Sequence, residues 1–369
     1  MPASAPLPCD HLEGETPATP RGDLLAEARD ILVFRALVLG DLLCATPALR
    51  ALRLAAPQAR ITLCSLPWAA ALAARLPMVD AFIEFPGHPD LPERRPAPGA
   101  LDRFVDDVRS RSFDLVLQMH GSGSIVNPLV TALGGRRSAG FATPGTEAGL
   151  DLAVPWPVQG TEVDRCLALA QALGAPGDGP RLAFPLSAAD RLGAAVLLRG
   201  AGVDGPFAIV HPGSQLPSRR WPPARFAAVA DALSDRGLHV VVTGSPAEAP
   251  LAAAVRAASR RPPVDLCGRT DTIWLLGALV ASASLVVAND TGISHVAAAL
   301  GVPSVIVASG SDVARWAPHD RARHRVLWHA TPCRPCAHAV CPTQHECAAG
   351  VLPQDVAASA LDLLESVSP

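Results

Sequence analysis

Short apolar runs alternate with helical segments along most of this chain, and the alternating pattern occurs twice. In the first half, strands are expected at residues 31–34, 61–65, 82–85 and 113–118. In the second half, they are expected at residues 207–210, 240–243, 264–266, 285–288 and 304–307. Alternation of this kind predicts parallel strands joined by helical crossovers, because a parallel strand is reached only by a connection that returns along the sheet. The predicted fold class is α/β, with two separate parallel sheets.

The length of the chain agrees with two domains, because 369 residues exceed what one hydrophobic core usually organises. We expect one Rossmann-like domain over residues 29–185 and a second over 206–350, joined by a linker region at 186–205. Residues 1–28 are rich in proline and small residues, which is typical of a disordered leader. A last helix within residues 351–369 is expected to pack back on the first domain.

The composition excludes several classes of partner and location. A net charge of −3 offers no broad basic surface, so no nucleic-acid partner is expected. No run approaches the roughly 20 apolar residues that a membrane span needs, and the first residues lack a signal-peptide pattern. We therefore expect a cytoplasmic protein, and peripheral contact with the cytoplasmic face of the inner membrane stays open.

Asp41 is the first candidate for catalysis, because it follows the first predicted strand and such loops usually hold functional groups. Its carboxylate can act as a general base that takes a proton from a sugar hydroxyl, or it can cap the next helix. That helix is expected to begin with Thr46 as N-cap and Pro47 at its first position. The turn at residues 35–41 has one glycine and no G-x-G-x-x-G pattern, which disfavours a nicotinamide or flavin dinucleotide site.

Two segments of the second half are candidates for binding a diphosphate. The first is His-Pro-Gly-Ser at residues 211–214, which follows a predicted strand and precedes Arg219 and Arg220. Small residues let backbone N–H groups approach a phosphate, and guanidinium groups bind its oxygens in pairs. A solvated basic turn is the alternative interpretation.

The second segment, Asn-Asp-Thr-Gly at residues 289–292, gives a sharper signal because a predicted strand precedes it and a helix of small residues follows. Thr291 and Gly292 then stand at a helix N-terminus, where phosphate binds favourably, and Asp290 can hydrogen-bond sugar hydroxyls. An ordinary capped turn is the alternative. Glu248, after another strand end, either binds ribose hydroxyls or complements a helix dipole.

Four of the nine cysteines lie within fifteen residues of one another. They are Cys333, Cys336, Cys341 and Cys347. In a reducing compartment this spacing favours a metal over disulfides, and four thiolates can close a tetrahedral structural site. The spacing is tighter than that of an ordinary zinc ribbon, so bound metal, free thiols and disulfides all stay open.

Taken in order, these motifs resemble those of glycosyltransferase family nine, the ADP-heptose:lipopolysaccharide heptosyltransferases. The resemblance begins at residues 31–35, 39–41 and 46–50. It continues at residues 114–118 with Gly121, at 211–214 with 220–222, at 243–244 with Glu248, and at 289–292 with His295. It covers about residues 30–364. One such motif is a weak signal, whereas the ordered series is specific.

The resemblance implies a GT-B fold, in which two Rossmann-like domains face a central cleft. It makes Asp41 the general base and Glu248 the ribose ligand. Donor and phosphate binding falls to Arg219, Arg220, Ser214, Asp290, Thr291, Gly292 and His295. Acceptor binding falls to Arg35, Gly40, Gln118 and Gly121. Arg219 stands where the family commonly has lysine, which keeps the charge and alters the reach.

The implied reaction is inverting transfer of a heptose or related sugar from an ADP-sugar to a lipopolysaccharide core or related glycan. No metal is required for it, and a metal in the cysteine cluster, if one is bound there, would be structural. Two alternatives stay open. One is the same chemistry on a protein or another acceptor, and the other is a non-catalytic metal or redox protein built around residues 333–347.

Overall fold

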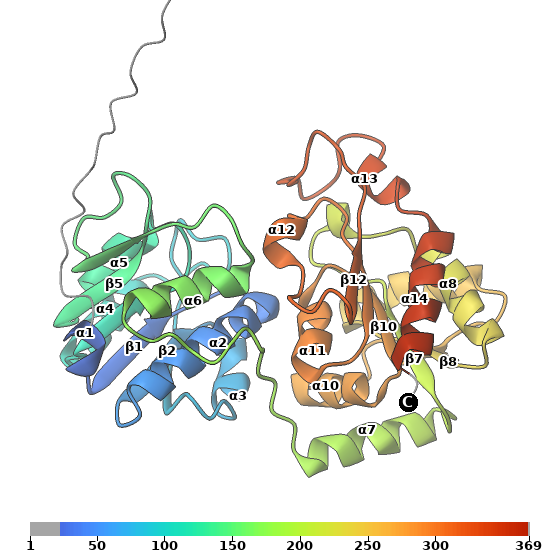
Figure 1. Cartoon of the computed structure of the whole chain (residues 1–369), viewed down its shortest axis with the longest axis horizontal. Helices are drawn as coiled ribbons and strands as arrows, with labels where there is room; N and C mark the ends of the chain where they lie inside the picture. Colours follow the sequence, from blue (N-terminus) through green and yellow to red (C-terminus); the bar gives the residue numbers. More distant parts are fainter. Residues whose placement is uncertain (1–22, 368–369) are drawn as a thin grey trace, which may run out of the picture.

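The computed structural model describes residues 23–367, which form two units that each contain a six-stranded sheet (Figure 1). The strand order is β3-β2-β1-β4-β5-β6 in the first sheet and β12-β11-β10-β7-β8-β9 in the second. All pairs within the two sheets are parallel. When the strands of each sheet are numbered 1 to 6 along the chain, the first sheet has the order 3-2-1-4-5-6. The second sheet has the same order when it is read from β9 to β12, and this is the order of Rossmann folds. The predicted α/β class with two parallel sheets is confirmed.

The first unit places its earliest strand at the centre of its sheet. Its strands are β1 (Asp30–Phe34), β2 (Arg60–Ser65), β3 (Ala81–Glu84), β4 (Leu115–Gln118), β5 (Arg137–Ala142) and β6 (Leu152–Pro155). Its helices are α1 (Asp23–Ala26), α2 (Leu39–Ala55), α3 (Ala70–Ala73), α4 (Ala100–Ser110), α5 (Val126–Ala132) and α6 (Glu162–Ala172). Along β1, Ile31 and Val33 join one apolar cluster while Leu32 and Phe34 join another. Both faces of the sheet are therefore covered, as a parallel sheet requires.

The second unit repeats this plan. Its strands are β7 (Phe207–His211), β8 (His239–Val242), β9 (Val264–Asp265), β10 (Leu285–Asn289), β11 (Ser304–Val307) and β12 (His324–Leu327). Its helices are α7 (Ala188–Gly200), α8 (Pro223–Asp235), α9 (Ala249–Ala258), α10 (Ile273–Ser282), α11 (Gly292–Leu300), α12 (Val313–Trp316), α13 (Glu346–Ala349) and α14 (Pro353–Val367). A short 3-10 turn, η2 (Pro217–Arg219), precedes α8.

One apolar cluster runs through the join between the two units. It contains Leu42 and Leu43 of α2 together with Ile293 and Val296 of α11. The helices approach so closely that a Cβ built on Gly40 would lie 2.6 Å from Cδ2 of His295. Only glycine fits this position, and the contact sets the start of α2 directly against α11.

The helix α2 begins earlier than the sequence predicted. The prediction placed Thr46 and Pro47 at the N-terminus, whereas the helix starts at Leu39 and Pro47 lies in its interior. A proline there leaves the carbonyl four residues earlier without its usual N–H donor. The hydroxyl of Thr46 donates to that carbonyl, on Leu43, at 2.7 Å. This local replacement lets the helix pass through Pro47, and it brings Asp41 into the first turn.

Three predicted boundaries are corrected by the packing. The expected leader covers residues 1–28, of which residues 1–22 lie outside the described residues. Residues 23–26 are not part of a leader, because they form α1 and Leu25 is buried. The linker region 186–205 is mostly the helix α7, which packs on α10 of the second unit. The last helix, α14, packs on α8 and on β11 rather than on the first unit (Figure 1). The chain reaches α14 from the second unit, and the helix buries its apolar face on that sheet.

Strands β5, β6 and β12 were absent from the sequence prediction. They lie at or next to a sheet edge, and their mixed side chains give no continuous apolar run. Over residues 23–367, no helix has the length and apolar content to cross a membrane.

Candidate active site

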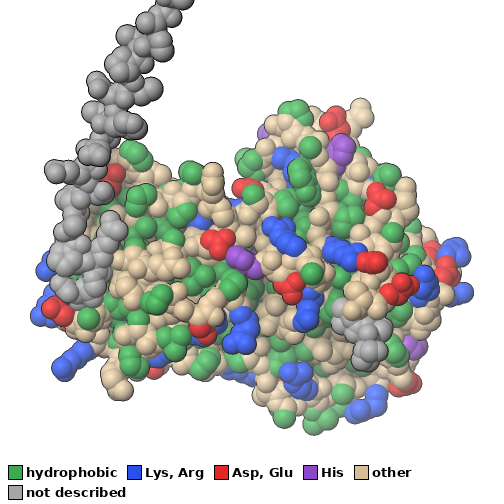
Figure 2. Space-filling model, viewed as in Figure 1, with side chains coloured by type: hydrophobic (Ala, Val, Ile, Leu, Met, Phe, Trp, Pro, Cys, Tyr) green, Lys and Arg blue, Asp and Glu red, His purple; other side chains and the backbone are tan. Residues whose placement is uncertain are grey.

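A pocket of about 170 Å³ lies between the two units, where loops from the carboxyl ends of both sheets meet. The surface in Figure 2 is notched between the two units. The pocket is lined by Val38, Gly40, Asp41, Ser214, Gln215, Leu216, Arg219, Asp290, Thr291, Gly292, His295, Ser311 and Trp316. It therefore brings together the predicted general base and all of the predicted donor residues except Arg220.

Asp41 faces this pocket from the first turn of α2, and 15 % of its side chain is exposed. The N-cap of α2 is Val38, and no side chain caps this helix, so Asp41 does not serve as its cap. Arg35 donates from Nε to the backbone oxygen of Asp41 at 2.8 Å, while its Nη2 lies 3.9 Å from Oδ1 of the carboxylate. Burial raises the pKa of Asp41, and the attraction of Arg35 offsets this only in part. The result is a partly exposed carboxylate with an increased affinity for a proton.

Asn289 holds together the two donor loops of the second unit. Its side chain is fully buried at the end of β10. Its Oδ1 accepts from the backbone N–H of Trp221 at 2.9 Å, and its Nδ2 donates to the backbone oxygen of Pro212 at 2.8 Å. A buried amide that satisfies both loops fixes their relative position, because loss of either bond would leave an unpaired polar group.

The N-terminus of α11 opens into the pocket. Thr291 is the N-cap, and its side chain makes no capping hydrogen bond, so the hydroxyl is free to meet a ligand. The first N–H groups of a helix lack partners within the helix and carry a partial positive charge. With Gly292 next in the chain, backbone donors at this point can approach an anionic group closely.

Arg219 lies across the pocket on η2, with its Nη2 donating to the backbone oxygen of Cys336 at 2.6 Å. Its Nε is buried without a partner, which leaves a donor for a ligand. Arg220 points elsewhere: its Nε donates to the backbone oxygen of Ser214 at 2.9 Å. The pocket thus has one arginine beside the helix N-terminus, and Arg220 braces the loop that carries Ser214.

These features fit a known family of proteins. Residues 101–346 match the model of glycosyltransferase family 9 (heptosyltransferase).

The chain belongs to glycosyltransferase family 9.

Similar proteins of this family include lipopolysaccharide heptosyltransferase 3 of Escherichia coli, 33 % identical over 120 residues. That match spans 32 % of this chain and only 35 % of the relative. Lipopolysaccharide heptosyltransferase 2 of Salmonella typhimurium is 27 % identical over 294 residues, or 74 % of this chain and 81 % of the relative. Among solved structures, the E. coli ADP-heptose LPS heptosyltransferase II is similar with a TM-score of 0.71 and 23 % identity. That alignment covers 91 % of this chain and 99 % of the other, which confirms the predicted GT-B fold.

The cysteine cluster of this family 9 chain lies beside the pocket rather than in it. Cys333, Cys336, Cys341 and Cys347 line a separate cavity of about 30 Å³. The cysteines of the described residues are free thiols. Across residues 23–367, no three His, Cys, Asp or Glu side chains are arranged to hold a metal ion. The predicted structural metal is therefore without support from this geometry.

The backbone of the cysteine segment supports the donor loops. Arg219 donates to the backbone oxygen of Cys336, and the backbone N–H of Ser218 donates to the backbone oxygen of Ala339. The backbone N–H of Cys336 donates to the backbone oxygen of Gly310 at 2.7 Å. Gly310 has a φ of +69°, and a Cβ there would meet the Cβ of Cys336 at 2.9 Å. The segment is thus tied to both η2 and the loop after β11.

Glu248 lies outside the residues that line the pocket. Its Oε2 accepts from the N–H and from the hydroxyl of Ser245, each at 2.8 Å, in a capping box. A Cβ on Gly213 would meet this carboxylate, so Glu248 borders the loop at residues 211–214. The structure shows the capping role, and the ribose role stays a prediction.

The predicted acceptor residues divide into two kinds. Gly40 lines the pocket, and Gly121 has open space where a Cβ would stand. Arg35 and Gln118 are buried instead. The guanidinium of Arg35 bonds inside the protein, and Nε2 of Gln118 donates to Oδ1 of Asn127 at 2.9 Å. These two side chains brace the loops of the first unit, so direct contact with an acceptor is not supported for them.

Sequence reasoning missed several residues of the site. Ser311, in the loop after β11, lines the pocket, and its hydroxyl is buried without a hydrogen-bond partner. The signal was available, because Ser311 follows a predicted strand end just as Asp290 does. Trp316 on α12 was also missed, and it has no equivalent signal.

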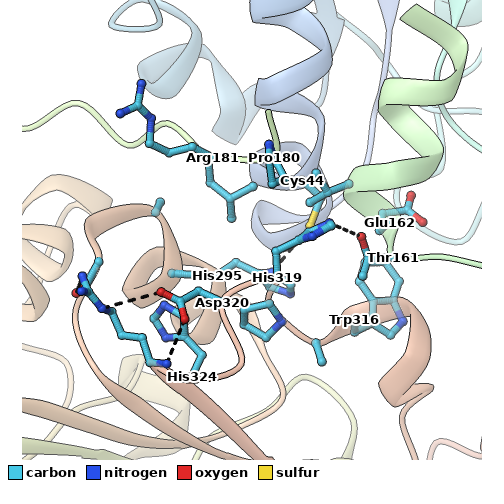
Figure 3. Close-up of a pocket in the computed structure, with 18 of the residues that line it drawn as sticks. Cys44, Thr161, Glu162, Pro180, Arg181, His295, Trp316, His319, Asp320 and His324 are labelled. Atoms are coloured by element: carbon cyan, nitrogen blue, oxygen red, sulfur yellow. Dashed lines mark hydrogen bonds and ion pairs between the residues drawn. The ribbon is translucent and has the colours of Figure 1, made fainter. Parts of the chain in front are cut away.

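A second and larger cavity, of about 430 Å³, adjoins the pocket along the join between the units (Figure 3). His295 and Trp316 line both spaces. Figure 3 shows His319 reaching Thr161, whose Oγ1 lies 2.9 Å from Nε2 of His319. Burial lowers the pKa of His295, whose ring lies between the two spaces.

Proposed function

We propose that this family 9 chain transfers a heptose from an ADP-activated heptose to a lipopolysaccharide core acceptor, with inversion at the anomeric carbon. The observation that carries the proposal is the placement of Asp41 from one unit opposite Arg219 and the N-terminus of α11 from the other. The names of the similar proteins support the substrate class, since they are heptosyltransferases of lipopolysaccharide.

In the proposed step, Asp41 takes the proton of an acceptor hydroxyl while that oxygen forms a bond to the anomeric carbon. The bond from this carbon to the diphosphate oxygen breaks, and ADP leaves from the opposite face with the electron pair. Negative charge grows on the diphosphate as it leaves. In this proposal, Arg219 and the backbone donors at Thr291 and Gly292, which line the pocket, stabilise that charge.

The first test is a comparison of ligands on the intact protein. ADP-heptose should raise the melting temperature, because a ligand that prefers the folded state stabilises it. UDP-sugars and NAD should have little effect at the same concentration. ADP release from ADP-heptose should then require a lipopolysaccharide core acceptor. Stabilisation by UDP-sugars alone, or release with a protein acceptor alone, would overturn the proposal.

We further propose that the chain works in the cytoplasm and meets its acceptor by peripheral contact at the inner membrane. The support is the acceptor class of its relatives, which are named for lipopolysaccharide. Sedimentation with vesicles that contain core lipopolysaccharide tests the contact, with vesicles of phospholipid alone as control. Equal sedimentation with both vesicles, or with neither, would contradict it.

We also propose that transfer requires no metal ion. The pocket offers an arginine and a helix N-terminus to the diphosphate, which can replace a cation in stabilising the charge. A chelator should change the rate less than about twofold, and elemental analysis should find no stoichiometric metal after treatment. Loss of activity that returns with added metal would contradict this.

A further inference from the structure

Glu162, the first residue of α6, lies among three arginines at the join between the units. Its side chain is almost fully buried, and so is that of Arg35. Arg35 donates from Nη2 to Oε1 at 3.0 Å, and Arg315 donates from Nε to Oε2 at 2.8 Å. Arg165, on the same helix, lies 3.6 Å from Oε2. Burial raises the pKa of Glu162, but Arg35 and Arg315 outweigh it and hold the pKa below its ordinary value.

This glutamate connects the two units. Arg35 and Glu162 belong to the first unit, whereas Arg315 belongs to α12 of the second. The guanidinium of Arg315 lies over the ring of Trp316 at 4.5 Å, and Trp316 lines the pocket that contains Asp41. Figure 3 shows Glu162 and Trp316 on the same side of the adjoining cavity.

Arg35 has two carboxylates within reach and favours one of them. Its Nη2 lies 3.0 Å from Glu162 and 3.9 Å from Asp41. A close ion pair between an arginine and a general base would weaken the base, because it stabilises the charged form. Glu162 therefore competes with Asp41 for the same guanidinium.

We propose that Glu162 is a positioning residue that keeps Arg35 from pairing closely with Asp41 and that ties this arrangement, through Arg315, to the contact between the two units. The inference rests on the proposed role of Asp41 as general base. Glu162 does not reach the pocket itself and acts through its two arginine partners.

The charged and titratable groups around Asp41 determine the direction in which each variant should change the pKa of Asp41. Burial has the largest effect and raises the pKa of Asp41; Arg35, His295 and Arg315 lower it, and Glu162 raises it. Arg35 lies in the turn between β1 and α2, and the other three groups come from α11, α12 and α6. Cys44 lies one turn further along α2, and Asp290 and Arg219 line the same pocket. Removing the charge of Glu162 should therefore lower the pKa of Asp41, and removing that of Arg315 should raise it.

The experiment compares Glu162→Gln, Arg315→Gln and Arg315→Lys with wild type. Protein labelled with ¹³C at aspartate Cγ reports the titration of Asp41 directly, with its signal assigned by its absence in Asp41→Asn. The midpoint should fall by about one pH unit in Glu162→Gln and rise by a similar amount in Arg315→Gln. Arg315→Lys keeps the charge and should return the midpoint toward the wild-type value.

His319→Gln is the matched control. His319 also crosses the join, with Nε2 at 3.1 Å from Oδ1 of Asp164, but it has no direct contact with Glu162 or Arg35. The midpoint of the Asp41 titration in His319→Gln should equal that of wild type. The acidic limb of kcat/KM should move with the titration, and kcat of Glu162→Gln should fall about tenfold while ADP affinity holds.

Shifts of equal sign in Glu162→Gln and Arg315→Gln would overturn the proposal, as would an equal shift in His319→Gln. The titration needs no turnover, so absence of transfer would contradict the proposed function while leaving this inference testable. If Glu162→Gln fails to fold, the two Arg315 variants still decide the sign, because the Arg315 side chain is 30 % exposed.

Discussion

The two sides of the pocket are built in different ways. On the second unit, short hydrogen bonds from Asn289 and from the cysteine segment join neighbouring loops and leave Thr291 and Nε of Arg219 free. On the first unit, Asp41 has no such brace for its carboxylate. Burial raises the pKa of this carboxylate, and Arg35, Glu162 and Arg315 of the other unit adjust it further.

This difference suggests what each side can tolerate. A site made of backbone donors and braced loops can bind the diphosphate in one fixed geometry, since little has to move when charge develops. The pKa of Asp41 is raised mainly by burial and is adjusted by neighbouring charges, one of which, Arg315, belongs to the other unit, so it should respond to the contact between units. Variants on the second unit should therefore affect donor binding and leaving-group departure, and variants on the first should affect proton transfer.

Arg219→Gln should have the largest effect on the donor side. Removing a preorganised donor from a developing anion typically costs about 10²–10³ in kcat. We expect a fall of that size in the rate of ADP release, with a smaller loss in ADP affinity. Arg236→Gln, a change on the exposed end of α8, is the control and should retain the full rate. A rate within threefold of wild type for Arg219→Gln would remove this residue from the mechanism.

The dependence of the rate on pH in the acidic range tests the role of Asp41. Asp41 must be ionised to accept a proton, and burial raises its pKa. The rate should be constant above that pKa and should fall about tenfold for each pH unit below it. The fall should begin at a higher pH than an exposed aspartate would give. Circular dichroism over the same range checks that the protein stays folded, and a flat profile down to the pKa of free aspartate would contradict the assignment.

Two buried asparagines, one in each unit, allow the effect on ADP binding to be separated from the effect on stability. Asn289→Ala should lower the free energy of unfolding by about 2 kcal/mol, because it leaves buried backbone groups unpaired. It should also weaken ADP binding about fivefold, since both donor loops lose their brace. Asn127 is the matched residue of the first unit: it is fully buried, and its Nδ2 donates to the backbone oxygen of Phe141 at 3.0 Å.

Asn127→Ala should lower the stability by a similar amount and leave ADP binding unchanged. Denaturant unfolding and calorimetric titration with ADP measure the two quantities. Equal losses of ADP affinity in both variants would show that the donor side is not braced independently of the first unit.

The sequence predicted best which residues line the pocket after strand ends. The alternation of apolar runs located both sheets, and the rule that loops after parallel strands carry function found Asp41, Asp290 and Thr291. The same rule, applied to the strand before Ser311, would have found that residue as well. Helix starts were harder, because Thr46 and Pro47 carry a strong N-terminal pattern that a single hydroxyl bond overrides.

Contacts that depend on how two units meet could not be read from the sequence. Glu162 and Arg315 are 153 positions apart, and neither lies in a motif. The packing of α14 was predicted on the wrong unit for a related reason. An amphipathic face indicates that a helix packs on the protein, but it does not indicate which element the helix packs on. Arg35 and Gln118 lie in motif segments, yet they are buried, because a motif records position and not which side chains face the pocket.

Single-turnover transfer by Asp41→Asn, measured together with ADP binding, tests the role of Asp41 as general base. We expect a loss of about 10²–10⁴ in rate with ADP affinity within twofold of wild type. Asp102→Asn, at an exposed first-turn aspartate of α4, should transfer normally. Transfer by Asp41→Asn at the rate of Asp102→Asn would contradict the claim that a carboxylate of the first unit activates the acceptor across the pocket.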